Sequence, residues 1–394
     1  MHGYFRLGYG VSTEKGRMVC FQAPGAPAKY RLGNECDQYG EFMLSAPAYV
    51  GADGVVASAN VMLYGYTPTS IGHPQAYTPP AGATGTGAEF GFANFFLDMK
   101  GIPWLSKGTL WVGRRYYKRE DFHVMDYFYW NPSGLGAGIE DIAIGEDLKF
   151  SYAAFVVDGP SVSPGAPAPA LPSPGAIGIR NDLQLRGLKL YPGGELQFGL
   201  DLVANASDDP GMHGGWGVTV RHVQAMLGGD NKLAVQYGQG AAIGFGLTDS
   251  LTNDSDVTRL RFVDVLSFQP ITWFGGQAAV IYQHDKLNVG TADWLTVGGR
   301  MAFGFAEHVK LLVDVGHDHV KPSAGDSREL TKITIAPAIS AGEAMFSRPE
   351  FRLFYTMGIF NDAARAAGVD SAGIYTNTDK TVGSTVGVHA EGWW

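Results

Sequence analysis

Residues 119–130 bring ionisable groups and aromatic rings together at unusually short spacing. The titratable members are Arg119, Glu120, Asp121, His123 and Asp126, and four consecutive rings follow from Tyr127 to Trp130. A packed core rarely holds this many charges, and a solvated loop rarely holds this many rings. The mixture favours a water-exposed protein surface that binds a flat, hydroxylated ligand. Sugars fit, because pyranose C–H groups pack on rings while their hydroxyls form charge-assisted hydrogen bonds.

A histidine flanked by two aspartates also fits part of a catalytic triad. His123 lies close in sequence to Asp121 and Asp126. A triad needs a nucleophile, however, and no serine in the chain lies in a Gly-x-Ser-x-Gly elbow. His317 and His319 could bind a metal ion, but no second cluster of ligands accompanies them. We therefore expect no enzymatic activity, no bound metal and no cofactor.

The elements that must position this segment are β-strands. Apolar and polar residues alternate with a period of two in segments such as 195–203, 277–284, 294–303, 309–315 and 351–359. Most such segments run to about nine to eleven residues, the length that a tilted strand needs to cross a bilayer. Their polar face is rich in Gly, Thr and Gln instead of Lys and Glu, which is typical of a barrel lumen.

The links between these strands are either very short or very long. Residues 192–194 and 228–231 read as tight turns, whereas 66–88, 158–177 and 361–381 are long and rich in Pro, Gly, Ser and Thr. Short turns that alternate with long loops are typical of outer-membrane barrels. We find no long helix, no nucleotide-binding glycine pattern and no repeat. The sequence therefore predicts an all-β fold, one transmembrane antiparallel β-barrel domain over residues 1–394.

Bulk composition argues against a nucleic-acid partner and against a membrane helix, and it leaves the state of the two cysteines open. The net charge of −9 argues against a nucleic-acid surface, and the 55 glycines suit many twisted strands with tight turns. No run of 18 apolar residues predicts a membrane helix. Residues 1–11 already alternate like a strand, so we expect no signal peptide in this sequence. Cys20 and Cys36 are either two unrelated buried thiols or one disulfide formed in an oxidising compartment.

Rings also recur on the polar, inward face of several strands. Tyr4 shares a face with Arg6, Tyr39 shares one with Glu41, and Trp393 shares one with His389 and Glu391. These rings could instead belong to an aromatic girdle at the membrane interface. That alternative is weaker for Trp393, because its neighbour Trp394 lies on the apolar face and can serve the girdle.

Four segments of the chain resemble the maltoporins, the sugar-specific porins of Gram-negative outer membranes. They are residues 20–42, 110–142, 346–354 and 392–394. The resemblance implies a homotrimer of antiparallel barrels of about 18 strands, embedded in outer-membrane lipid. It also implies an inward-folded constriction loop, here about 118–140, and an oligosaccharide as the partner that passes through.

The resemblance also assigns residues to two walls of such a pore. The aromatic slide falls on Tyr4, Tyr39, Phe346 and Trp393. The charged, hydrogen-bonding track falls on Arg6, Arg31, Glu41, Arg119, Asp121, His123 and Asp126. The narrowest point falls on Phe128, and Cys20 and Cys36 match the disulfide of the first loop.

The chain departs from the family pattern at several of these positions. Phe128 stands where maltoporins have a tyrosine, so the constriction stays narrow and becomes less polar. Asp230 stands where the slide usually has another ring, and Gly91 or a neighbour replaces a track arginine. The ring lent by a neighbouring subunit would lie in the diverged loop 66–88, where Tyr77 is the only candidate we name. These changes leave maltodextrin, sucrose and other glucosides as alternative substrates.

The sequence thus predicts a passive, sugar-specific channel of the outer membrane. The first alternative is a general diffusion porin, which would conduct ions without being blocked by sugar. A second alternative is an outer-membrane enzyme or an adhesin built on a barrel. Loops 66–88 and 158–177 could also serve as phage receptors.

Overall fold

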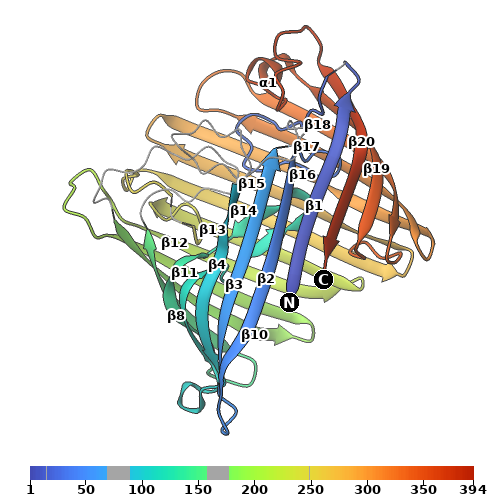
Figure 1. Cartoon of the computed structure of the whole chain (residues 1–394). Helices are drawn as coiled ribbons and strands as arrows, with labels where there is room; N and C mark the ends of the chain where they lie inside the picture. The colour runs from blue at the N-terminus through green and yellow to red at the C-terminus, as the bar shows by residue number, and fades with distance from the viewer. Residues whose placement is uncertain (15, 69–88, 158–176, 248) are drawn as a thin grey trace.

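The computed structural model of the chain is a closed β-barrel. It describes residues 1–14, 16–68, 89–157, 177–247 and 249–394. Eighteen antiparallel strands form one sheet, and β1 (His2–Ser12) closes it by pairing with both β2 (Asp37–Val50) and β20 (Val382–Trp393). Figure 1 shows the strands wound around the lumen, with the two chain ends close together on β1 and β20.

The remaining barrel strands follow one another around the wall in chain order. They are β3 (Val56–Pro68), β4 (Glu89–Lys100), β5 (Thr109–Arg115), β8 (Gly134–Ala143), β9 (Lys149–Val157), β10 (Gly178–Tyr191), β11 (Gly194–Asn205), β12 (Gly215–Met226), β13 (Gly229–Gly240), β14 (Thr258–Ile271), β15 (Phe274–Leu287), β16 (Gly290–Ala306), β17 (Val309–Lys321), β18 (Arg328–Ser340) and β19 (Glu350–Phe360). Each predicted alternating segment lies within one of these strands. Many strands exceed the predicted length, up to 17 residues in β16, because backbone pairing continues beyond the part that must cross the bilayer.

The apolar side chains face outward and the polar ones face inward, which is the reverse of a water-soluble protein. In β19, the outward Phe351 and Leu353 are 60% and 61% exposed, whereas the inward Arg352 and Thr356 are buried. The alternation along the strand places every second residue on the same face. An apolar outside and a polar inside identify the barrel as membrane-embedded. Among the described residues, no helix is long and apolar enough to span a membrane.

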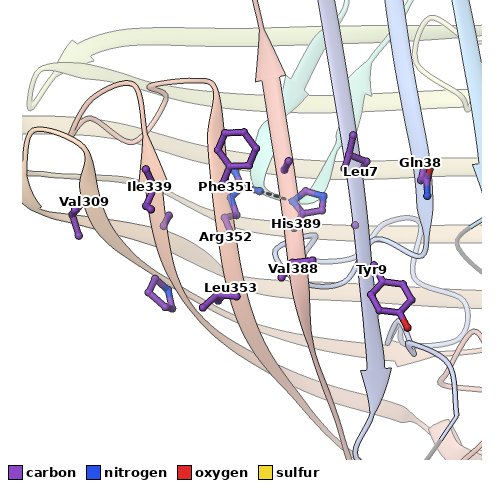
Figure 2. Close-up of a pocket in the computed structure, with 14 residues that line it drawn as sticks. Leu7, Tyr9, Gln38, Val309, Ile339, Phe351, Arg352, Leu353, Val388 and His389 are labelled. Carbon is purple, nitrogen blue, oxygen red and sulfur yellow. Dashed lines mark hydrogen bonds between the residues drawn. The ribbon is translucent and has the colours of Figure 1, made fainter.

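An apolar groove of about 590 Å³ runs along this outer wall, over strands β17 to β20 and β1. Figure 2 shows Leu7, Val309, Ile339, Leu353 and Val388 around it, on the outside of the barrel. Its lining offers almost no polar group to a ligand, so it is not a candidate for the solute-binding site.

The loop between β1 and β2 folds into the barrel and fills part of the lumen. Cys20 and Cys36 form a disulfide, as the resemblance implied, and this closes the loop. The ring of Tyr30 lies on the inward glycines Gly298 and Gly316, where an added Cβ would come within 2.6 and 2.0 Å of it. The loop thereby fills the lumen on the side of β16 and β17.

The segment between β5 and β8 also folds inward and forms a hairpin of its own. It contains β6 (Glu120–Phe122), the 3-10 helix η2 (His123–Met125) and β7 (Tyr127–Trp130). The constriction loop expected at about 118–140 therefore ends before Gly134, because β8 already belongs to the wall.

Two other short helices lie outside the barrel wall. They are η1 (Pro103–Leu105) in the link between β4 and β5 and α1 (Asp362–Ala366) in the predicted long loop 361–381. The predicted loops 66–88 and 158–177 lie almost wholly outside the described residues.

Candidate functional site

Three predicted rings lie side by side on neighbouring strands. Strand pairing places Tyr4 of β1 opposite Trp393 of β20, and Arg6 opposite Tyr39 of β2. The ring centroids of Tyr4 and Trp393 are 6.5 Å apart with an interplanar angle of 18°, and those of Tyr4 and Tyr39 are 6.3 Å apart. The regular spacing gives the lumen a row of ring faces.

Phe346 continues this row through a histidine. It lies in the turn between β18 and β19, and its ring centroid is 5.6 Å from that of His123. His123 in turn lies 5.7 Å from Trp393, with the two rings nearly perpendicular at 89°. Burial lowers the pKa of His123 to about 3. His123, predicted for the charged track, is therefore a neutral ring at pH 7 that bridges two members of the aromatic row.

Arg6 ties the wall, the first loop and the constriction loop together. Its guanidinium binds the Asp37 carboxylate at 3.0 and 3.2 Å, and Nη1 lies 2.9 Å from Oδ2 of Asp126. A third carboxylate, that of Glu35, lies 3.0 Å from Nε. Arg6 and Asp126 thus pair with each other, and the tip of the constriction loop is held against β1.

Arg31 lies behind the row of rings, not in front of it. It is 4% exposed, and it contacts Glu35 at 2.9 Å and Glu391 at 2.9 Å. It also donates a hydrogen bond of 2.5 Å to the hydroxyl of Tyr4. Burial alone would raise the pKa of the Glu35 carboxyl, but Arg31 and Arg6 hold it well below its usual value. The geometry makes Arg31 a residue that positions Tyr4.

A second arrangement of charge and ring lies beside Tyr39. The guanidinium carbon of Arg119 lies 3.6 Å from the ring centroid of Tyr116 and 4.4 Å from that of Phe128. The hydroxyls of Tyr116 and Tyr39 both donate to Oε1 of Glu41, at 2.9 and 2.5 Å. Arg119 is therefore fixed between two rings, while Glu41 links Tyr39 to Tyr116.

A cavity of about 570 Å³ lies at the short-turn end of the passage. It is lined by the predicted residues Asp121, His123, Phe346 and Trp393, together with Gly229, Asp230, Lys232, Ser267 and Gln277. Asp230, which replaces a ring of the family pattern, lies here 3.7 Å from the ammonium of Lys232. Burial and the neighbouring Asp126 raise the pKa of Asp121. This end of the passage therefore offers carboxylates opposite the rings.

Sequence reasoning missed four residues that shape this passage. Tyr116 and Tyr64 add rings, and Arg348 and Arg352 pair with Glu391 behind Trp393. Arg348 also places its guanidinium carbon 4.4 Å from the Trp393 ring centroid. Inward alternation could have found Arg352. Tyr64 lies in a part of β3 whose two faces are similarly apolar, and Tyr116 and Arg348 lie just beyond strands, where the period of two no longer applies.

Replacing Phe128 with alanine should raise the ion conductance of a single barrel. Tyr127, Tyr129 and Trp130 are buried against the wall, whereas Phe128 is half-buried and covers Arg119. Removal of its ring widens the passage at the constriction loop. Conductance of single channels in planar bilayers measures this, and Phe128→Tyr, which keeps the ring, is the matched control. Equal conductance of the alanine variant and the wild type would show that another residue sets the narrowest point.

Comparison with known proteins gives one family and several structural neighbours. The sequence model of a family described as LamB porin matches residues 1–394. OpdK, an outer-membrane protein of Pseudomonas aeruginosa, aligns over 100% of this chain and 98% of its own, with 9% identity and a TM-score of 0.56. A structure of the same protein with vanillate gives 12% identity and a TM-score of 0.54 over the same shares. OccAB4 of Acinetobacter baumannii gives 10% identity and a TM-score of 0.52, also over 100% and 98%. At these identities the structural neighbours support the barrel fold alone.

Proposed function

Since the chain belongs to the LamB porin family, we propose that it is a sugar-specific channel in which oligosaccharides slide along the rings beside β1. The chain is a passive porin of the Gram-negative outer membrane. The observation that carries the sugar proposal is the row of Tyr39, Tyr4 and Trp393 at spacings of 6.3 and 6.5 Å. Consecutive rings at this spacing can face consecutive sugar units.

In this proposal, each sugar unit uses both walls of the passage. The apolar face of a pyranose stacks on Tyr4 or Trp393, and its hydroxyls exchange hydrogen bonds with Glu41, Arg119 and Asp121. Hydrogen bonds to ionised groups are stronger than neutral ones, so a few such contacts suffice. Transport also requires that each subsite binds weakly enough to release the sugar. A series of similar, partly exposed subsites meets both demands.

Membership of the LamB porin family also supports a homotrimeric assembly. The apolar groove over β17 to β20 and β1 (Figure 2) then faces a neighbouring subunit or the acyl chains of outer-membrane lipid. A role of the long loops as phage receptors stays a hypothesis, because residues 69–88 and 158–176 lie outside the described part of the chain. The LamB porin family is a family of channels, which favours transport over the enzyme or adhesin alternative.

Sugar should block the ion current of the wild-type channel. We expect maltotriose or sucrose, added to single channels in planar bilayers, to interrupt the current in a concentration-dependent way, because a bound sugar fills the constriction. Absence of block even at concentrations on the order of tens of millimolar would contradict sugar specificity and favour the general diffusion porin. Comparing several sugars in the same measurement would rank the substrates.

A further inference from the structure

A ring that belongs to neither predicted wall extends the aromatic row across β3. The centroid of Tyr64 lies 6.4 Å from that of Tyr39, with an interplanar angle of 27°. This spacing repeats the 6.3 Å between Tyr39 and Tyr4. Strand pairing places Tyr64 opposite Glu41, whose side chain faces the lumen. Four neighbouring strands, β20, β1, β2 and β3, therefore each contribute one ring.

The strand on the other side of Tyr64 provides the space for its ring. Gly91 of β4 pairs with Tyr64. A Cβ added to Gly91 would lie 2.9 Å from Cε1 of Tyr64 and 3.2 Å from the Tyr64 hydroxyl oxygen. The backbone of Gly91 does not have a positive φ, so its conformation does not demand glycine. The contact with the Tyr64 ring is thus the visible reason for a glycine at this position.

The opposite end of the row ends at charged side chains. At the short-turn end, Phe346 is the last ring, and the cavity beyond it is lined by Asp230 and Lys232. The row starts at Phe346 and crosses successive strands away from that turn. Because barrel strands are tilted, such a row advances along the barrel axis as it crosses them. Strand pairing, however, sets Tyr64 in register with Glu41 and Tyr4, two residues closer to the short turns than Tyr39, so Tyr64 extends the row sideways across β3 and no further toward the long loops.

We infer that Tyr64 is a sugar-binding platform that lengthens the binding path of this channel across β3. This inference rests on the proposed sugar function. A sugar unit over Tyr64 would have the Glu41 carboxylate beside it as a hydrogen-bond acceptor. Short sugars can bind within the segment from Tyr39 to Trp393 without reaching β3. The substrate class that Tyr64 serves is accordingly a linear oligosaccharide of several units.

Tyr64→Ala tests the inference, because its effect on affinity should depend on the length of the sugar. Affinity is measured by current block with a series of linear maltodextrins from two to six units. For the longest sugars we expect the affinity to fall by about threefold to tenfold, the order of one ring contact, with little change for the disaccharide. Tyr64→Phe should retain the wild-type affinities, because it keeps the ring. Phe90→Ala removes a ring from the outward face of β4 and should have no effect.

Gly91→Ala tests the same point with Tyr64 still present. The added methyl group should displace the Tyr64 ring and so lower the affinity for long sugars, with little change for the disaccharide. An equal loss for sugars of every length would overturn the inference, since it would mean that Tyr64 only supports Tyr39. Unchanged affinities in Tyr64→Ala would overturn it as well. Both results differ from a failure of the proposed function, in which the wild-type channel would show no block by any sugar.

Discussion

Replacing Trp393 with alanine should weaken sugar binding at least about tenfold, corresponding to about 1.4 kcal/mol, and leave ion conductance nearly unchanged. Trp393 is the largest ring of the row, and it contacts both Tyr4 and His123. Burying a large apolar side chain typically contributes about 1.5–3 kcal/mol, and a stacked sugar would bury part of this ring. Its loss interrupts the path between Tyr4 and Phe346. Concentration-dependent current block measures the affinity, and open-channel current measures the conductance.

The next residue provides the control for Trp393→Ala. Trp394 is 56% exposed on the outer face, where it packs on Phe5 with ring centroids 6.2 Å apart. Trp394→Ala removes the same ring from the same strand end, but on the membrane side. It should leave sugar affinity at the wild-type value. A similar loss of affinity in both variants would indicate general disturbance of the β1–β20 seam instead of a lost stacking site.

Strand alternation predicted the wall of the barrel well, for a physical reason. A membrane barrel needs an apolar outside and a polar inside along its whole height, so the period of two persists through most strands. Segments 309–315 and 351–359 accordingly lie in β17 and β19. β3 shows where the signal weakens. Its inward face carries Met62 and Tyr64, which are as apolar as the outward face, so period alone could not assign Tyr64 to the lumen.

The candidate site was predictable as a set of residue types but not as a set of partners. Arg31 and Glu391 are at opposite ends of the chain, and only closure of the barrel brings them to 2.9 Å. Arg6, which the resemblance places on the charged track, binds carboxylates of the first loop, β2 and the constriction loop, and the inward folding of these loops brings the partners together. The sequence suggests a charged, polar role for His123. In the structure, burial lowers the pKa of its imidazole, which lies between two rings. Ionisation and partner choice depend on packing, which no local pattern encodes.

The largest effect on stability is expected at Glu391, a buried acceptor behind the rings. Its carboxylate contacts Arg31 at 2.9 Å, Arg348 at 2.8 Å and Arg352 at 2.5 Å, and its side chain is 1% exposed. Glu391→Gln keeps the shape but removes the charge, so three buried guanidinium groups lose a shared counter-ion. Breaking a buried ion pair by removing one partner costs about 3–5 kcal/mol. The midpoint of guanidinium unfolding, followed by tryptophan fluorescence in detergent, should fall accordingly.

Glu307→Gln is the matched control for this substitution, because it makes the same chemical change at a surface position. The Glu307 side chain is 85% exposed, and its one ion-pair contact in the described structure is with His308 at 4.0 Å. Exposed pairs of this kind contribute about 0–1 kcal/mol. The two variants should therefore differ by several kcal/mol in free energy of unfolding. The hydroxyl of Tyr4 also donates a hydrogen bond of 3.1 Å to Oε1 of Glu391. Equal stability of the two variants would mean that the remaining carboxylates neutralise Arg31, Arg348 and Arg352 sufficiently, and that Glu391 serves only to accept this hydrogen bond.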